Sequence, residues 1–169
     1  MAILVADIKF YLSGGASNSD VDASLGGVVS SVEVTTSSLH NLFDRVSGAE
    51  ALAGDTEYRC IYTKNTHGSL TLQTAVAWIS SNTPSTASTI DIGLGTSAIS
   101  ATEQTVANES TAPSAVTFTA PATLGAGLAI GNLTPADTMA IWIRRTITAS
   151  AGPYTTDTVT LNVGGDTAA

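Results

Sequence analysis

Residues 57–64 have the sequence Glu-Tyr-Arg-Cys-Ile-Tyr-Thr-Lys, which gives the clearest indication of the fold. Tyr58, Cys60 and Tyr62 occupy one set of alternate positions, and Ile61 and Thr63 belong to the other. Successive side chains of a β-strand point to opposite faces of the sheet, so this pattern predicts a strand. We expect Cys60 to be buried as a small hydrophobic residue, because it lies between two tyrosines on one face.

Seven further segments either alternate in the same way or are rich in β-branched residues, and both features favour strands. Glycine, proline and asparagine separate them, as is typical of turns. About eight strands at this spacing predict an all-β protein, with a single antiparallel β-sandwich domain (jelly-roll or immunoglobulin-like) over residues 1–169. The further segments are residues 8–12, 28–35, 70–78, 90–94, 116–118, 139–143 and 159–163.

One segment has helical periodicity. Leu39, Leu42, Phe43 and Val46 follow the i, i+3, i+4, i+7 spacing of a helix face, with Ser37 or Ser38 as its cap and Gly48 as its end. We expect at most one short helix in the chain, and it would lie here. The alternative is an irregular connection whose apolar side chains close one end of the sandwich. Residues 83–89 and 97–114 lack any pattern and are expected to be long loops.

Composition and charge exclude several function classes. Charged residues make up 12% of the chain and the formal net charge is −8, with six lysines and arginines in total. Nucleic-acid binding depends on cationic side chains that neutralise phosphates, so we expect neither nucleic acid nor an anionic membrane as a partner. We see no signal peptide and no apolar run that would span a bilayer. One cysteine cannot form an internal disulfide.

Titratable groups for catalysis are scarce. His40, His67 and Cys60 are far apart in the sequence, and the chain contains no nucleophile-elbow or Cys-His signature. Zinc needs more histidine or cysteine ligands than these. We therefore expect no enzymatic activity and no cofactor.

A weak calcium motif lies between two Gly-Gly pairs. Asn18, Asp20, Asp22 and Ser24 place oxygen side chains at every second position, as a calcium-binding loop does. The motif lacks the glycine after the third ligand and the glutamate that closes such a loop. A solvated loop built from Asx-turns explains the spacing equally well.

Two regions are candidates for an interface. The first is the N-terminal segment with Ile8 and Phe10, since residues 1–12 form either an arm that contacts a neighbouring subunit or an ordinary strand of their own sheet. The second contains arginines: Arg144 and Arg145 follow Trp142 and offer ion pairs or stacking, although solvated strand-end charges are the simpler alternative. Arg59 is a further interface candidate, and it could form a weak surface ion pair with Glu57, two residues away on the same face.

Three longer runs of sequence resemble small virion structural proteins of tailed bacteriophages, including capsid decoration (cement) proteins and neighbouring head or neck components. The runs are residues 57–65, residues 108–113 leading into 116–118, and residues 130–137 leading into 141–145. The resemblance extends over roughly residues 5–165 and contains no catalytic motif.

The resemblance implies a β-sandwich that binds the major capsid protein or another virion protein and stabilises the shell without catalysis. It also implies a homotrimer or other small homo-oligomer, made in the host cytoplasm and located in the virion. The first alternative is a neck, tail or baseplate component of the same particle. The second is a carbohydrate- or host-surface-binding β-sandwich that uses Trp78, Trp142 or Tyr154 to stack on sugar rings.

Overall fold

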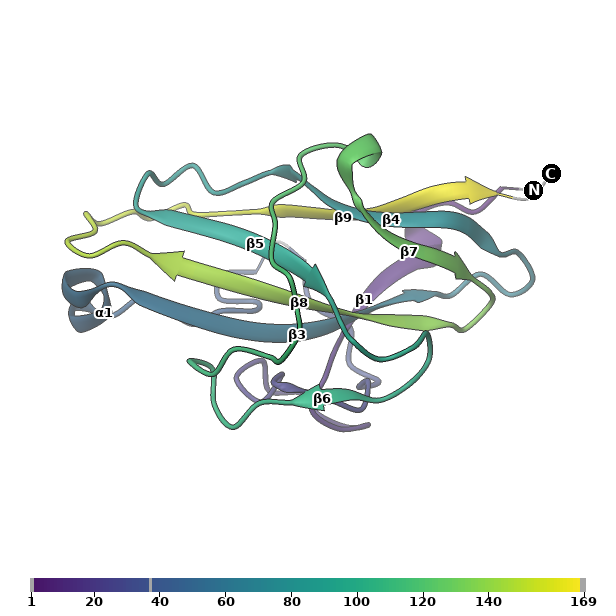
Figure 1. The fold of residues 1–169 in the computed structure, drawn as a ribbon, viewed down its shortest axis with the longest axis horizontal. Coiled ribbons are helices and arrows are strands. Elements are labelled where there is room, and N and C mark those ends of the chain that lie inside the picture. The colour runs from purple at the N-terminus through teal and green to yellow at the C-terminus, as the bar shows by residue number, and fades with distance from the viewer. Residues whose placement is uncertain (1, 37, 168–169) are drawn as a thin grey trace.

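A computed structural model describes residues 2–36 and 38–167 of the chain, and in that part the protein is built mainly from nine β-strands (Figure 1). One short α-helix and two 3₁₀ turns complete the elements. In chain order they are η1 (Val5–Asp7), β1 (Ile8–Leu12), β2 (Gly26–Gly27), α1 (Gly48–Ala53), β3 (Asp55–Asn65), β4 (Leu72–Ser81), β5 (Ser88–Leu94), β6 (Glu103–Thr105), η2 (Leu124–Ala126), β7 (Leu128–Leu133), β8 (Thr138–Ile147) and β9 (Thr160–Thr167).

Four strands form the main sheet, in the order β1-β3-β8-β5, and every neighbouring pair is antiparallel. At its centre β3 pairs with β8 in continuous register from Asp55 opposite Ile147 to Lys64 opposite Thr138. Both strands alternate regularly, and a regular alternation fixes the register because a slip of one residue would exchange the two faces. These two strands are therefore the rigid centre of the molecule.

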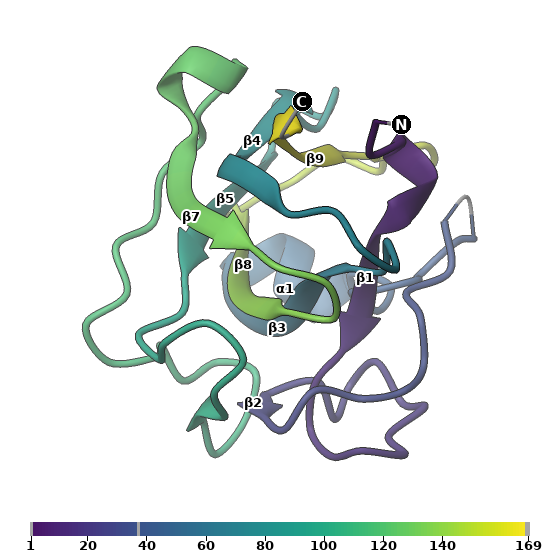
Figure 2. The same cartoon turned by 90° about the vertical axis from the view of Figure 1, so that its right-hand side faces the viewer.

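A second sheet, in the order β7-β4-β9, packs on one face of the main sheet (Figures 1 and 2). The main apolar core lies between the two sheets, where Ile61, Ile92 and Ile141 of the main sheet meet Ala77 and Ile79 of β4. Their side chains are almost completely removed from water, and such burial is the chief stabilising contribution to a fold of this size. The all-β antiparallel sandwich expected from the sequence is confirmed.

The opposite face of the main sheet is covered as well. Tyr58, Cys60, Tyr62 and Trp142 form a second core there, which is closed by the β2–β6 pair and by irregular segments that contribute Val29, Val106, Val116 and Phe118. Figure 2 shows this third layer below the main sheet, with β2 in it. The expected burial of Cys60 is confirmed, since its side chain is fully enclosed.

Two of the predicted strands are wrong as full strands. Over residues 28–35 the structure has a single isolated bridge, Glu33 to Tyr11, and Ser30 Oγ accepts a hydrogen bond from the Val32 amide at 3.0 Å. Such local side-chain bonds compete with a regular ladder. Residues 116–118 cover the second core, and only Thr119 bridges to β5. Conversely, β6 lies within the predicted loop 97–114, and β7 was not predicted.

The short helix is also in a different place from the one predicted. Residues 38–46 contain no helix: residues 39–43 are turns and bends, and the rest is irregular; Ser37 lies outside the described residues. Leu42 and Phe43 pack against the main core, in agreement with the alternative of an irregular connection. The helix instead begins at Gly48, where Ser47 caps it: Ser47 Oγ accepts from the Glu50 amide, and the Glu50 carboxylate accepts from the Ser47 amide. The Ser47 and Glu50 spacing of this capping box is visible in the sequence, but no helix was predicted from it.

The N-terminal strand lies within its own chain. One edge of β1 pairs with β3, and on the other edge Leu12 donates to the Val32 carbonyl while Val34 donates to the Phe10 carbonyl. Ile8 and Phe10 are partly buried against the main core. Of the two interpretations of this segment, the ordinary strand of its own sheet describes its position in this chain.

Candidate functional site

The densest group of charged side chains lies at the α1 end of the main sheet. We call it the acid–arginine cluster; it consists of two arginines and four carboxylates, namely Asp22, Asp44, Glu57, Arg59, Glu109 and Arg145. Glu57 and Arg59 follow each other on the face of β3 that also carries Ile61, so the cluster continues the plane of the main core. Glu57 and Arg145 are directly opposite each other on β3 and β8.

Two of the three loops that supply the remaining carboxylates are bonded directly to β3. Beyond Leu12, the edge of β3 is no longer paired with β1; there Cys60 donates its amide to the Ser24 carbonyl, and Tyr58 donates to the Glu109 carbonyl. These backbone bonds fix the loops that contain Asp22 and Glu109. Each loop therefore has a defined position beside β3 although its sequence shows no periodicity.

Each arginine joins two carboxylates. Arg59 Nη2 lies 3.1 Å from Asp22 Oδ1 and also bonds to Glu109 Oε2, and its side chain is fully buried. Arg145 bonds to Glu57 through Nε, and through its Nη atoms to Asp44 Oδ1 at 3.1 Å and to the Asp44 carbonyl at 2.7 Å.

An aromatic ring separates the two arginines from the apolar core. The guanidinium carbons of Arg59 and Arg145 lie 5.6 Å and 4.8 Å from the centroid of the Phe43 ring, within the range of cation–π attraction. Phe43 is itself packed against the main core. The ring thus replaces water on one side of both guanidinium groups, and this low-polarity surrounding strengthens their attraction to the carboxylates.

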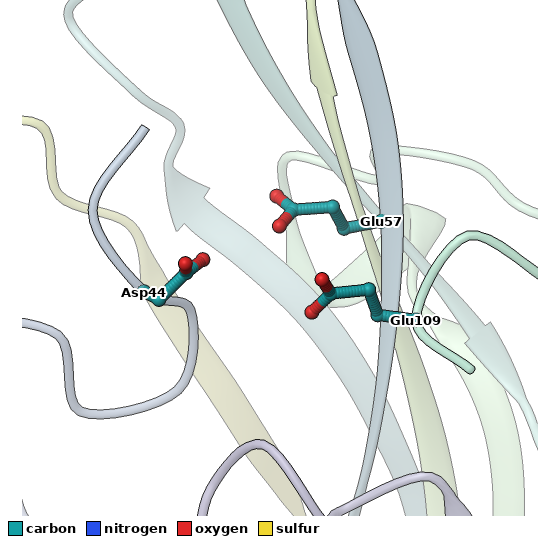
Figure 3. A group of neighbouring side chains, drawn as sticks. All are labelled: Asp44, Glu57 and Glu109. Carbon is teal, nitrogen blue, oxygen red and sulfur yellow. The ribbon is translucent and has the colours of Figure 1, made fainter. Parts of the chain in front are cut away.

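The cluster contains buried polar atoms that have no partner in the described part of the chain. Glu57 is 2% exposed, and its Oε1 makes no hydrogen bond; Arg59 Nε is in the same condition. Burial raises the pKa of Glu57, although the hydrogen bond and charge of Arg145 act against that shift, while Asp44 and Glu109 add to it. Oxygen atoms of Asp44, Glu57 and Glu109 lie within 4.8 Å of one another, and their carboxylates point toward a common centre (Figure 3).

The cluster opens to solvent through a surface cavity of about 310 Å³, which is lined by Asp22, Asp44 and Glu109 with Leu25, Ala107 and Asn108. Carboxylate oxygens and a fixed cationic frame can hold loops in place or ligate a hard cation. Among the described residues, the lining holds acidic and amide side chains but no histidine, serine or cysteine.

A second polar centre lies in the outer layer, and no pattern in the sequence indicated it. Glu103 is 3% exposed and accepts hydrogen bonds from the amide and hydroxyl groups of Thr96 and Ser97 and from Trp142 Nε1. Burial alone would raise the pKa of Glu103, but these bonds outweigh it and lower the pKa to about 2. In the sequence, this glutamate lies in a long stretch without a pattern, so it cannot be told apart from an ordinary surface glutamate. Only the structure shows the groups that donate hydrogen bonds to it.

The calcium motif predicted at residues 18–24 is folded as successive Asx-turns. Asn18 Oδ1 accepts from the Asp20 amide, and Asp20 Oδ1 accepts from the Asp22 amide, each at 3.0 Å. Asn18 Nδ2 donates to the Ser13 and Asp20 carbonyls, while Asp22 turns away to Arg59. The oxygens are therefore distributed along the loop, as expected for the alternative, a loop built from Asx-turns.

The arginine candidates are held within the chain. The prediction of a weak Glu57–Arg59 surface pair is wrong, because both side chains are buried and each binds a different partner. Arg59 is thus not a surface group. Arg144 bonds to Asp91 at 2.7 Å and lies 5.0 Å from the Phe118 ring centroid.

The histidines occupy two unrelated places. His67 Nδ1 accepts hydrogen bonds from the amides of Ser69 and Leu70 and thereby closes the turn after β3. His40 is exposed at a loop position with a φ of 56°. The thiol of Cys60 is enclosed in the second core, and burial raises its pKa well above the usual value. Each of these groups therefore has its own separate environment.

Comparisons with family models, with curated proteins and with solved structures found no match for this chain. Within the described residues, each helix is too short to cross a lipid bilayer.

Proposed function

We propose that the protein is a structural component of a tailed-phage virion, and that it docks on the assembled capsid as a decoration protein without catalysing a reaction. The proposal rests first on the resemblance of residues 57–65, 108–118 and 130–145 to such proteins. The structural observation that supports the proposal most is that charged side chains of this chain bind one another. Within the described residues, ten of the twenty charged side chains form ion pairs across loops and strands, which favours a stiff surface.

The acid–arginine cluster illustrates this use. Arg59 and Arg145 connect β3 and β8 to the loops of Asp22, Asp44 and Glu109. A preorganised surface loses little conformational entropy when it binds, so even a modest contact area gives useful affinity. The abundant serine, threonine and alanine side chains add to this effect, because they have few rotamers to lose.

The charge distribution indicates the chemistry of the partner. Four of the six lysines and arginines, Lys9, Arg59, Arg144 and Arg145, form ion pairs inside the chain. The net charge of −8 therefore belongs to a surface on which few cationic side chains are free to bind a partner. Such a surface complements a capsid surface rich in lysine and arginine, and repeated weak contacts on a lattice add up through multivalency.

The test is co-sedimentation of the purified protein with preformed empty capsids of the phage, followed by cryo-electron microscopy of the mixture. We expect saturable binding that weakens as sodium chloride rises from 50 mM to 500 mM, with density at repeated positions of the shell. Absence from the shell at low salt would refute decoration. A copy number of about a dozen or fewer in the mature virion, as for a ring at one vertex, would instead favour the neck or tail alternative.

One observation favours the carbohydrate-binding alternative as a second candidate. Trp142 is fully buried, but Trp78 lies on the outer face of the second sheet, partly exposed, beside Gly164 of the neighbouring strand. A ring over a glycine on an open sheet face is a possible stacking platform for a sugar. Glycan-array binding that disappears in Trp78→Ala would support this candidate, and an array without binding would reject it.

A further inference from the structure

We propose that Asp44, Glu57 and Glu109 of the acid–arginine cluster together bind one calcium ion. Their three carboxylates come from a loop, from β3 and from a second loop, and their oxygens lie within 4.8 Å of one another. Calcium–oxygen distances are about 2.3–2.6 Å, so two ligands of one ion are separated by at most about 5 Å. The three carboxylates meet this condition, and Figure 3 shows them directed at one another.

The buried oxygen of Glu57 is the independent observation that points to a ligand. Glu57 is 2% exposed, and its Oε1 has no hydrogen-bond partner among the described residues. A buried carboxylate oxygen without a partner is costly, and native proteins normally satisfy such atoms with a donor or an ion. The carboxylate that carries this oxygen points toward Asp44 and Glu109 (Figure 3), so a cation between the three would satisfy it.

The arginines orient the carboxylates and leave one oxygen of each for the ion. Arg145 binds Oε2 of Glu57 and Oδ1 of Asp44, and Arg59 binds Oε2 of Glu109. Among the described residues, Oε1 of Glu57 is buried without a hydrogen-bond partner, and the recorded bonds of Asp44 and Glu109 to the arginines use Oδ1 and Oε2, not the second oxygen. The arginines thus act as the outer partners that hold ligating carboxylates in place.

The charge and the donor set favour calcium over other ions. The four carboxylates and two guanidinium groups of the cluster sum to −2, which a divalent cation neutralises. All the candidate donors are oxygens, which suits a hard ion and disfavours zinc. Asp44 and Glu109 border the open cavity, which leaves room for water to complete a coordination shell of six to eight oxygens.

Calcium at this site would connect the loops of Asp44 and Glu109 to β3, in addition to the arginine bonds and to the Tyr58 amide bond of the Glu109 loop. Binding that is restricted to the folded state stabilises that state, so calcium should raise the melting temperature. The effect is independent of the proposed role in a virion, because it is measured on the isolated chain.

The experiment is isothermal titration calorimetry with CaCl₂ after EDTA treatment, together with thermal unfolding with and without 5 mM CaCl₂. Asp44→Asn and Glu109→Gln test the site, and both positions are exposed enough for the variants to fold. Asp20→Asn is the matched control, since it removes a carboxylate from the nearby Asx-turn loop. Circular dichroism verifies that each variant is folded.

We expect calcium to raise the melting temperature of the wild type by at least about 3 °C. Asp44→Asn and Glu109→Gln should each weaken binding by roughly tenfold or more, while Asp20→Asn should bind like the wild type. Absence of binding to the wild type up to 10 mM CaCl₂ would overturn the proposal. Equal binding by all four proteins, or a loss confined to Asp20→Asn, would overturn it as well.

Discussion

Glu103 provides the sharpest test of how buried charge stabilises this protein. Its carboxylate accepts five hydrogen bonds, two each from Thr96 and Ser97 and one from Trp142, and the two from Ser97 measure 2.9 Å and 2.6 Å. These contacts tie residues 96–97 and β8 to β6. Substitution of Glu103→Gln retains the size of the side chain but replaces one accepting oxygen by an NH₂ group, which faces donors.

The size of the effect follows from the bonds and from the pKa. A hydrogen bond to a charged group contributes about 1.5–3 kcal/mol, and the substitution removes at least two of them, so we expect a loss of about 3 kcal/mol at pH 7. The pKa of Glu103 is about 2 in the folded protein, below the ordinary value of 4.5. A lowered pKa means that the ionised carboxylate favours folding. Its contribution is complete above about pH 5 and declines as the pH falls toward 2; about 2 kcal/mol should be lost by pH 3.

The assay is urea denaturation of the wild type and Glu103→Gln at pH 7, 5, 4 and 3. The difference in unfolding free energy between the two proteins should shrink by about 2 kcal/mol between pH 7 and pH 3, because only the wild type loses the contribution of this carboxylate. Asp157→Asn is the matched control, with an expected change within about 0.5 kcal/mol, since among the described residues Asp157 accepts a single long hydrogen bond, 3.4 Å, from the Ser85 amide. A pH-independent difference, or a variant as stable as the wild type, would refute the reasoning.

Three further predictions concern other parts of the core. Arg59→Met should lower the unfolding free energy in urea by about 2–3 kcal/mol, because its carboxylate partners lose their buried counter-ion but are exposed enough to turn to water; an unchanged midpoint would contradict this. Gly26→Ala should cost at least about 3 kcal/mol, since a Cβ would lie 1.9 Å from the Gln104 carbonyl oxygen at a φ of +94°, whereas Gly68→Ala, with open space around it, should stay within about 1 kcal/mol in the same assay. Cys60 should not react with Ellman's reagent in the folded protein but should react fully in 6 M guanidinium chloride, because its thiol is completely buried and its pKa is raised; rapid labelling of the native protein would show that the second core opens.

The long strands of the main sheet could be predicted because they alternate regularly. Residues 57–64 and 139–143 show a clean two-residue period, and they form β3 and β8, the paired centre of the sheet. Residues 28–35 and 116–118 have strand-like composition but cover other elements, and this difference depends on neighbours that local sequence does not specify. The helix was misplaced because an apolar spacing was preferred over the capping box at Ser47 and Glu50.

The acid–arginine cluster was only partly accessible to prediction. Arg59, Arg145 and Asp22 were identified as candidates, but for an interface or a calcium loop. Asp44 and Glu109 had no distinguishing feature, since single acidic residues in loops are usually solvated. Their importance depends on Arg145 and Arg59, which are 101 and 50 residues away in the chain.

By itself, the amino-acid sequence determined the β class of the protein, the positions of its longest strands and the enclosure of Cys60. Those properties follow from the alternation of side chains across a strand, which is a local rule. The tertiary structure alone decided that the outer layer covers the main sheet, that Glu103 is a buried acceptor and that six charged side chains gather at one strand end. Electrostatic and hydrogen-bond partners act through space, so residues without any local pattern acquire partners only when the register of the sheet brings their segments together.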